Sequence, residues 1–145
     1  MVPSTRKFGI SLVLIATMAA GGAFAEDAGP PHDVDHAGLP KLGKVWLEKN
    51  PYRGTKYQAL ATKIGADAFN QNCARCHGLD AISGGIAPDL RYLDKGEMGD
   101  AWFIHRIRNG YTQNGMTKMP RWQGILSQET MWAIRCYLDS RYKGP

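Results

Sequence analysis

Apolar side chains recur at intervals of three and four residues in three separate segments of this chain, which is the spacing of one helix face. The segments with this spacing are residues 62–76, 101–108 and the stretch that starts at Ser127. In the last of them, Met131, Ile134 and Leu138 would form the apolar face. No segment sustains the alternation of apolar and polar residues that is typical of a strand. The pattern therefore predicts an all-α fold.

Glycine and proline residues mark two loops between these helices, at residues 78–98 and 110–124. Asp100 precedes an apolar stretch and is expected to cap the N-terminus of the helix over 101–108. Residues 26–61 lie ahead of the first helix, and their composition predicts a flexible leader and an N-terminal extension. Within this region residues 42–49 are expected to form a short helix. Residues 62–145 are then the folded domain.

The first 25 residues have the order of features of a secretory signal peptide. Arg6 and Lys7 give a positive start, residues 8–20 are almost wholly apolar, and the small residues Ala23 and Ala25 mark a cleavage site. An uncleaved membrane anchor is the alternative, but the apolar run is shorter than the roughly 20 residues that a spanning helix needs. Residues 1–25 are therefore predicted to be removed on export, which leaves the chain in the periplasm without a membrane anchor.

The chain has 18 lysine and arginine residues against 13 aspartate and glutamate residues, and two of the basic ones belong to the predicted signal peptide. The mild positive balance that remains does not indicate nucleic-acid binding. It fits a negatively charged protein partner, because complementary charge raises encounter rates, and it fits a merely solvated surface equally well. The three cysteines are an odd number for a disulfide framework. Cys136 is expected to be a small buried side chain, with a disulfide-linked dimer as the alternative.

The strongest motif is Cys73-Ala74-Arg75-Cys76-His77, whose C-x-x-C-H spacing is that of covalent haem attachment. On a helix, Cys73, Cys76 and His77 share one face, so two sulfurs can meet the two haem vinyl groups while the imidazole reaches the iron. Zinc binding would need a second pair of ligands at similar spacing. A thioredoxin-like thiol pair would need a βαβ context, which the pattern lacks. One covalent haem c is therefore predicted.

The sixth iron ligand is predicted to be Met119, which precedes Pro120 in the loop before the last helix. Methionine and histidine together are the ligand pair of electron-carrying cytochromes, and the proline would stiffen the approach of the sulfur. Met116 is the rival ligand, and packing of both methionines against the haem is the alternative to ligation. His105 is expected to have a surface or packing role. Arg91 and Trp122 are candidates for bonding the haem propionates, by residue type and by position in the loops.

Residues 62–142 resemble the class I c-type cytochromes in Gly65, Phe69, the Cys73–His77 motif, Pro88, Met119-Pro120 and Tyr137-Leu138. The resemblance implies the helical class I fold with one covalent haem. It also implies that Gly65 lets the first and last helices cross closely, against the aromatic ring of Tyr137. The carbonyl of Pro88 would accept a hydrogen bond from the imidazole of His77 and raise its basicity.

Three further strings are similar to the soluble cytochromes c that accept electrons from quinoprotein (PQQ-dependent) alcohol dehydrogenases, the ethanol enzyme especially. They are residues 50–54, 84–90 and 119–122. This resemblance implies an electron-transfer protein rather than an enzyme. It would take single electrons from such a dehydrogenase and pass them to a downstream cytochrome or terminal oxidase. The alternative is a haem enzyme or a gas-binding cytochrome with an open sixth coordination position.

Overall fold

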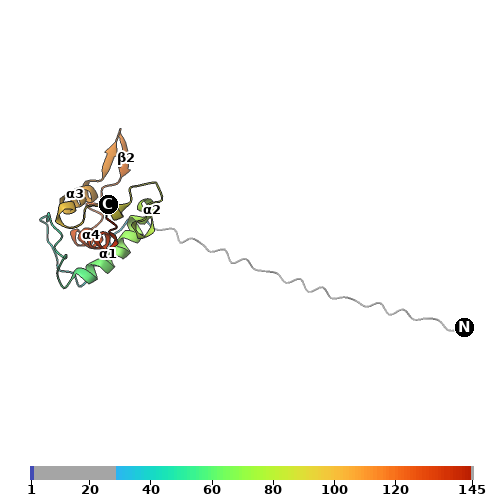
Figure 1. The fold of residues 1–145 in the computed structure, drawn as a ribbon, viewed down its shortest axis with the longest axis horizontal. Coiled ribbons are helices and arrows are strands. Elements are labelled where there is room, and N and C mark those ends of the chain that lie inside the picture. Colours follow the sequence, from blue (N-terminus) through green and yellow to red (C-terminus); the bar gives the residue numbers. More distant parts are fainter. Residues whose placement is uncertain (2–28, 145) are drawn as a thin grey trace.

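The computed structural model describes residues 1 and 29–144, and Figure 1 shows the helical body that they form. The predicted signal peptide, apart from Met1, lies outside the described residues. Within the described part of the chain, no helix combines the length and the apolar character that crossing a membrane requires.

Two helices that are far apart in the sequence cross at the centre of the domain: α1 (Gln58–Asn72) and α4 (Gln128–Arg141). They approach so closely that a Cβ atom on Gly65 would lie 2.0 Å from the carbonyl oxygen of Ala133, so this position admits only glycine. One side of the crossing is closed by Phe69 and Tyr137, whose ring centroids are 5.3 Å apart with planes tilted by 47°. The close crossing implied by the resemblance is present, and α1 begins earlier than the predicted residue 62.

Three short helical elements and the longer helix α3 follow α1 along the chain. The helix α2 (Ala74–His77) follows α1 directly, and two 3-10 turns follow at Leu79–Ala81 (η1) and Leu90–Tyr92 (η2). Then α3 (Glu97–Asn109) begins after Gly96, four residues before the predicted start. Asp100 is therefore not an N-cap. It lies inside α3 and is fully buried, because two arginines pair with its carboxylate.

A β-hairpin interrupts the predicted loop over 110–124. Its strands β1 (Tyr111–Gln113) and β2 (Met116–Met119) pair antiparallel, and in Figure 1 the hairpin projects from the helical body beside α3. Asn114 and Gly115 form the two-residue turn with positive φ angles of 51° and 75°, which is the backbone of the tight turn that suits twisted strands. The fold is mostly helical, as predicted, with this one small sheet in the described residues.

Residues 39–53, which we call the N-terminal strap, pack against the helices although they form no helix or strand. Residues 42–49 are not the short helix that was predicted. Leu39 and Tyr52 are buried in the core, and the backbone N–H of Leu42 donates to the Glu129 carboxylate at 2.7 Å. Buried polar side chains of α4 thus satisfy the backbone of the strap. Most of the strap lies in the predicted N-terminal extension, and this extension packs against the helical body.

Candidate functional site

The Cys73–His77 motif forms a single tight helical turn at the junction of α1 and α2. The N–H of Cys73 still bonds to the carbonyl of Phe69 in α1 at 2.8 Å. The N–H groups of Cys76 and His77 both reach back to the carbonyl of Cys73, at 3.1 and 2.9 Å. Side chains three and four positions apart in such a turn project from the same face. The two thiols and the imidazole are therefore presented together.

The two thiols of this motif are unpaired and differ in environment. Cys73 is half-buried, and burial raises the pKa of its thiol to about 12, whereas Cys76 is exposed. A thiol that stays protonated at neutral pH is a weak nucleophile and a weak metal ligand. Nowhere in residues 29–144 do three or more histidine, cysteine or acidic side chains gather as a metal-ligand set.

The imidazole of His77 is oriented by the carbonyl oxygen of Pro88, which lies 3.0 Å from Nδ1. A carbonyl can only accept, so this contact assigns the proton to Nδ1 and leaves the lone pair of Nε2 free. A histidine that ligates a metal through Nε2 characteristically donates its other N–H in this way. The arrangement that the resemblance implied for Pro88 is thus present, and His77 fits the role of a haem-iron ligand.

The two candidate methionines occupy different positions on the hairpin. Met116 stands beside the turn and is 56% exposed, whereas Met119 ends β2, is half-buried and packs against the core. The strand pairing shifts by one residue just before Met119, so that Lys118 is an extra, bulged residue on β2. Bulges of this kind change the direction of neighbouring side chains. The structure thus turns Met119 inward and leaves Met116 at the surface.

The two propionate candidates have partners within the protein. Arg91 forms a two-point ion pair with Asp89, with Nε–Oδ1 and Nη2–Oδ2 distances of 3.0 and 2.7 Å. This hydrogen bonding holds the pKa of Asp89 at about 2. Trp122 is buried, and its backbone N–H donates to the carbonyl of Ile107 at 3.0 Å. Arg91 therefore keeps only Nη1 free of Asp89, and Trp122 is fixed by α3.

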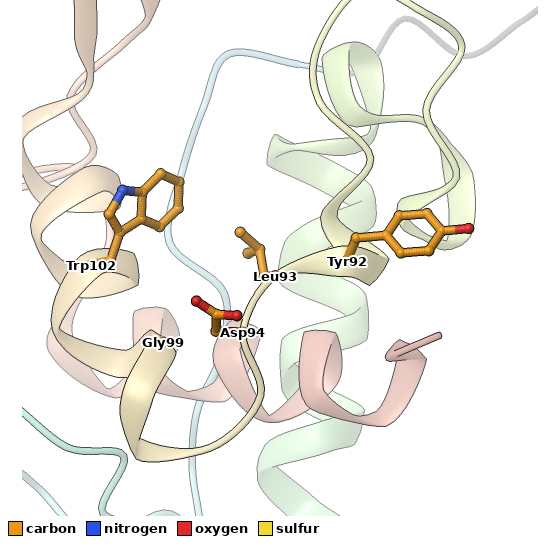
Figure 2. A pocket seen from close by; sticks show the side chains of 5 residues that line it. All are labelled: Tyr92, Leu93, Asp94, Gly99 and Trp102. Atoms are coloured by element: carbon orange, nitrogen blue, oxygen red, sulfur yellow. The ribbon is translucent and has the colours of Figure 1, made fainter. Parts of the chain in front are cut away.

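A cavity of about 190 Å³ lies between the segment after η2 and the first half of α3. Its lining residues are Tyr92, Leu93, Asp94, Gly99 and Trp102. Figure 2 shows Leu93 and Trp102 turned toward the same space, while Tyr92 points away from it. None of the predicted ligands lines this cavity. Leu93 and Trp102 are apolar side chains of the kind that line cofactor sites, and the sequence pattern gave no reason to select them.

Comparison with known proteins identifies the family. Residues 60–138 match the sequence model of the family described as cytochrome c oxidase, cbb3-type, subunit III. The chain is 51% identical to a cytochrome c550 of Pseudomonas aeruginosa over 131 residues, which cover 89% of this chain and 90% of the relative. It is 34% identical to a cytochrome c6 of Euglena gracilis, over 55% of this chain and 92% of that protein.

A match of another kind is to the quinohemoprotein alcohol dehydrogenase ADH-IIG of Pseudomonas putida. It is 34% identical over 81 residues, which are 54% of this chain but only 10% of that enzyme. No solved structure gives a significant match. The relatives matched over most of their length are cytochromes, which carry covalently bound haem c and transfer electrons rather than catalyse a reaction. The chain belongs to the class I c-type cytochromes, and it is a monohaem electron carrier.

Proposed function

We propose that Cys73 and Cys76 form the two thioether bonds to the haem, and that His77 and Met119 are its axial iron ligands. The observation that carries this proposal is the 3.0 Å contact between His77 Nδ1 and the Pro88 carbonyl oxygen, which leaves Nε2 for the iron. Bound in this way, the haem supplies a centre that accepts and releases one electron.

The chain's own residues determine how this centre behaves. Donation from Nδ1 to Pro88 fixes the orientation of the His77 ring, and the thioether of Met119 would raise the reduction potential of the haem. Because His77 and Met119 would both bind the iron, a substrate would have no access to it, and electrons would enter and leave without bond making. Arg91 and Trp122 would hold the haem propionates, Arg91 through Nη1. Leu93 and Trp102 would supply apolar contacts to the haem beside α3.

The electron donor, in this proposal, is a PQQ-dependent alcohol dehydrogenase of the periplasm, most specifically an ethanol-oxidising one. Support comes from the match to a quinohemoprotein alcohol dehydrogenase, in which the 81 aligned residues form only a small segment. A separate electron carrier for such an enzyme is expected to resemble a cytochrome-like segment of this kind. The acceptor is a downstream cytochrome or terminal oxidase. The 30% identity over 94 residues to the cbb3-type oxidase subunit FixP of Rhizobium meliloti supports this choice of electron acceptor.

Docking to the donor would be assisted by exposed positive charge. Arg75 in α2, Lys118 on the hairpin and Arg121 just after it are all exposed. Arg106 and Arg108, in contrast, stack on aromatic rings of the chain itself. Exposed charges steer encounter and are screened by salt. The rate of electron transfer should therefore fall as the ionic strength rises, and a rate that stays constant between low and high salt would contradict this part of the proposal.

The axial ligands are tested with the purified holoprotein and the variants Met119→Ala and Met116→Ala. The reduced protein and Met116→Ala should exclude carbon monoxide at neutral pH, whereas Met119→Ala should bind it rapidly and change its visible spectrum. Rapid binding by the unchanged protein would favour the alternative of a gas-binding or catalytic haem with an open sixth position. An unchanged spectrum in Met119→Ala would rule out that residue as the ligand.

The donor is tested by stopped-flow mixing of the ferric protein with a quinoprotein ethanol dehydrogenase and ethanol. Reduction should require both the enzyme and the alcohol, and should outpace reduction of an unrelated acidic cytochrome c used as a control. If reduction is no faster than that of the control, the assignment of the donor fails while the assignment of the ligands stands.

A further inference from the structure

We infer that Trp46 of the N-terminal strap, stacked on Arg108, is a positioning residue that keeps Met119 on the iron. This inference rests on the proposed role of Met119 as the sixth ligand. It gives a function to a segment that lies outside residues 60–138, the part of the chain that matches the family.

The first of the contacts that link Trp46 to Met119 is between the strap and the last turn of α3. The guanidinium carbon of Arg108 lies 4.1 Å from the centroid of the Trp46 ring, and both side chains are half-buried. Such stacking combines packing with attraction between the cation and the ring face, and tryptophan provides the strongest version of it. Trp46 therefore limits where the Arg108 side chain can lie.

The second contact is between Arg108 and the segment that follows Met119. Arg108 Nε donates to Gln123 Oε1 at 3.1 Å, and the N–H of Gln123 donates back to the carbonyl of Arg108 at 3.3 Å. The preceding residue, Trp122, bonds to Ile107 in the same turn of α3. The chain just after Met119 is thus fixed to the end of α3 by two backbone bonds and one side-chain bond.

The chain just before and at Met119 is fixed to the same end of α3. Met119 pairs with Tyr111, which follows α3 after a single glycine. That residue, Gly110, has a φ of 71°, and a Cβ atom there would lie 2.4 Å from the carbonyl oxygen of Met119. Met119 is therefore held on both sides by the end of α3, and a displacement of Arg108 or Gln123 would be transmitted to it.

Trp46 is itself held in place by one buried amide. Gln128, at the start of α4, accepts from the N–H of Leu47 at 2.7 Å and donates to the carbonyl of Val45 at 3.0 Å. Both neighbours of Trp46 are thus bonded to the same side chain, which is only 5% exposed. The strap links the rigid start of α4 to the residue that supports the methionine segment. Loss of the Trp46 ring should therefore free Met119 locally, while the crossing of α1 and α4 stays intact.

The experiment uses free imidazole as a probe of the ferric holoprotein, because imidazole binds the iron only when the thioether has left it. Its apparent affinity therefore reports the fraction of molecules in which Met119 is detached. In Trp46→Ala this affinity should rise about fivefold, which corresponds to about 1 kcal/mol. Trp46→Phe keeps a ring under Arg108 and should stay near the unchanged protein. Arg108→Leu removes both the stacking and the bond to Gln123, so it should raise the affinity at least as much as Trp46→Ala does. The double variant should add little to Arg108→Leu, because the contact with Trp46 is already lost there.

Leu39→Ala is the matched control. Leu39 is a buried strap residue, and its loss should lower the urea midpoint of unfolding, followed by far-UV circular dichroism, without raising the affinity for imidazole. If Trp46→Ala raises that affinity no more than Leu39→Ala does, Trp46 is merely structural and the inference is overturned. The variant Met119→Ala distinguishes failure of the proposed iron ligand from failure of the inference about Trp46. If this variant binds imidazole no better than the unchanged protein, the proposed ligand fails, and if only Met119→Ala responds, the inference alone fails.

Discussion

Replacement of Asp100 should show how much the buried charges of this protein, as distinct from its apolar core, contribute to the free energy of unfolding. Its carboxylate is fully buried in α3 and accepts four hydrogen bonds. Arg53 of the strap donates two of them, both at 2.7 Å, and Arg135 of α4 donates one at 3.0 Å. The N–H of Asn50 donates the fourth at 2.9 Å. One carboxylate thus joins the strap, α3 and α4.

The substitution Asp100→Asn keeps the shape of the side chain but removes its charge. Arg135 is 1% exposed, so its guanidinium would lose an anionic partner in a place that water does not reach. Breaking a buried ion pair by removing one partner typically costs about 3–5 kcal/mol. Domains of this size are typically stable by only about 5–15 kcal/mol, so the variant should lose a large part of its free energy of unfolding.

The pH dependence of this loss follows from the pKa of Asp100. Burial alone would raise that pKa, but hydrogen bonds from Arg53, the Asn50 N–H and Arg135 lower it below its ordinary value. A carboxyl whose pKa is lower in the folded state stabilises the fold above its unfolded pKa of about 4, and this stabilisation disappears as the pH falls toward the folded pKa. The difference between the two proteins should therefore be full at pH 7 and shrink below about pH 4.

The assay is urea unfolding of the holoprotein, followed by far-UV circular dichroism, at a series of pH values from 7 to 3. Asp67→Asn is the matched control, because Asp67 lies exposed on α1 and its loss should change the free energy of unfolding by less than about 0.5 kcal/mol. A loss below about 1 kcal/mol for Asp100→Asn at pH 7 would refute the reasoning. So would a difference from the unchanged protein that persists undiminished at pH 3.

Further substitutions address other features, each with its own measurement. Gly65→Ala would force a Cβ atom to within 2.0 Å of the Ala133 carbonyl oxygen, and it should cost at least about 3 kcal/mol in urea unfolding or prevent folding. Gly115→Ala places a side chain at a φ of 75° and should cost about 1 kcal/mol, without altering the α-helical circular dichroism. Burial raises the pKa of the Cys136 thiol to about 11, so it should resist alkylation by iodoacetamide at pH 7.5 until urea unfolds the chain, and reducing and non-reducing gels should be alike.

The features of this fold that depend on residues close together in the sequence could be predicted from the sequence. The spacing within Cys73–His77 is enough to place three side chains on one face of a turn. The apolar periodicity located α1, α3 and α4. Both α1 and α3 begin four residues earlier than predicted, and α1 ends at Asn72 rather than at Cys76. The hairpin was missed because its strands are short and exposed and so lack an alternating pattern. The dipeptide Asn114-Gly115, which is the strongest short-range signal of a tight hairpin, could have revealed it.

The features that could not be predicted depend on residues far apart in the sequence. Asp100 follows the rule for a helix cap, but its partners Arg53 and Arg135 lie 47 and 35 positions away, and burial between them overrides the local preference. The strap was expected to form a short helix over residues 42–49, and it forms none. Its order comes from single side chains, such as Gln128, that satisfy its backbone across more than 80 positions of sequence.

The position of the strap also has a consequence for the order of assembly. The partners of Leu42 and Leu47 are Glu129 and Gln128, 87 and 81 positions later, so these bonds cannot form before the chain has been made as far as α4. Contacts that close such long loops form late, because the entropy of closure is lost before the contact compensates for it. A segment synthesised early is therefore among the last to dock. Until then α3 and α4 lack the covering that the strap gives them, and a chain truncated before α4 would leave the strap without its anchor.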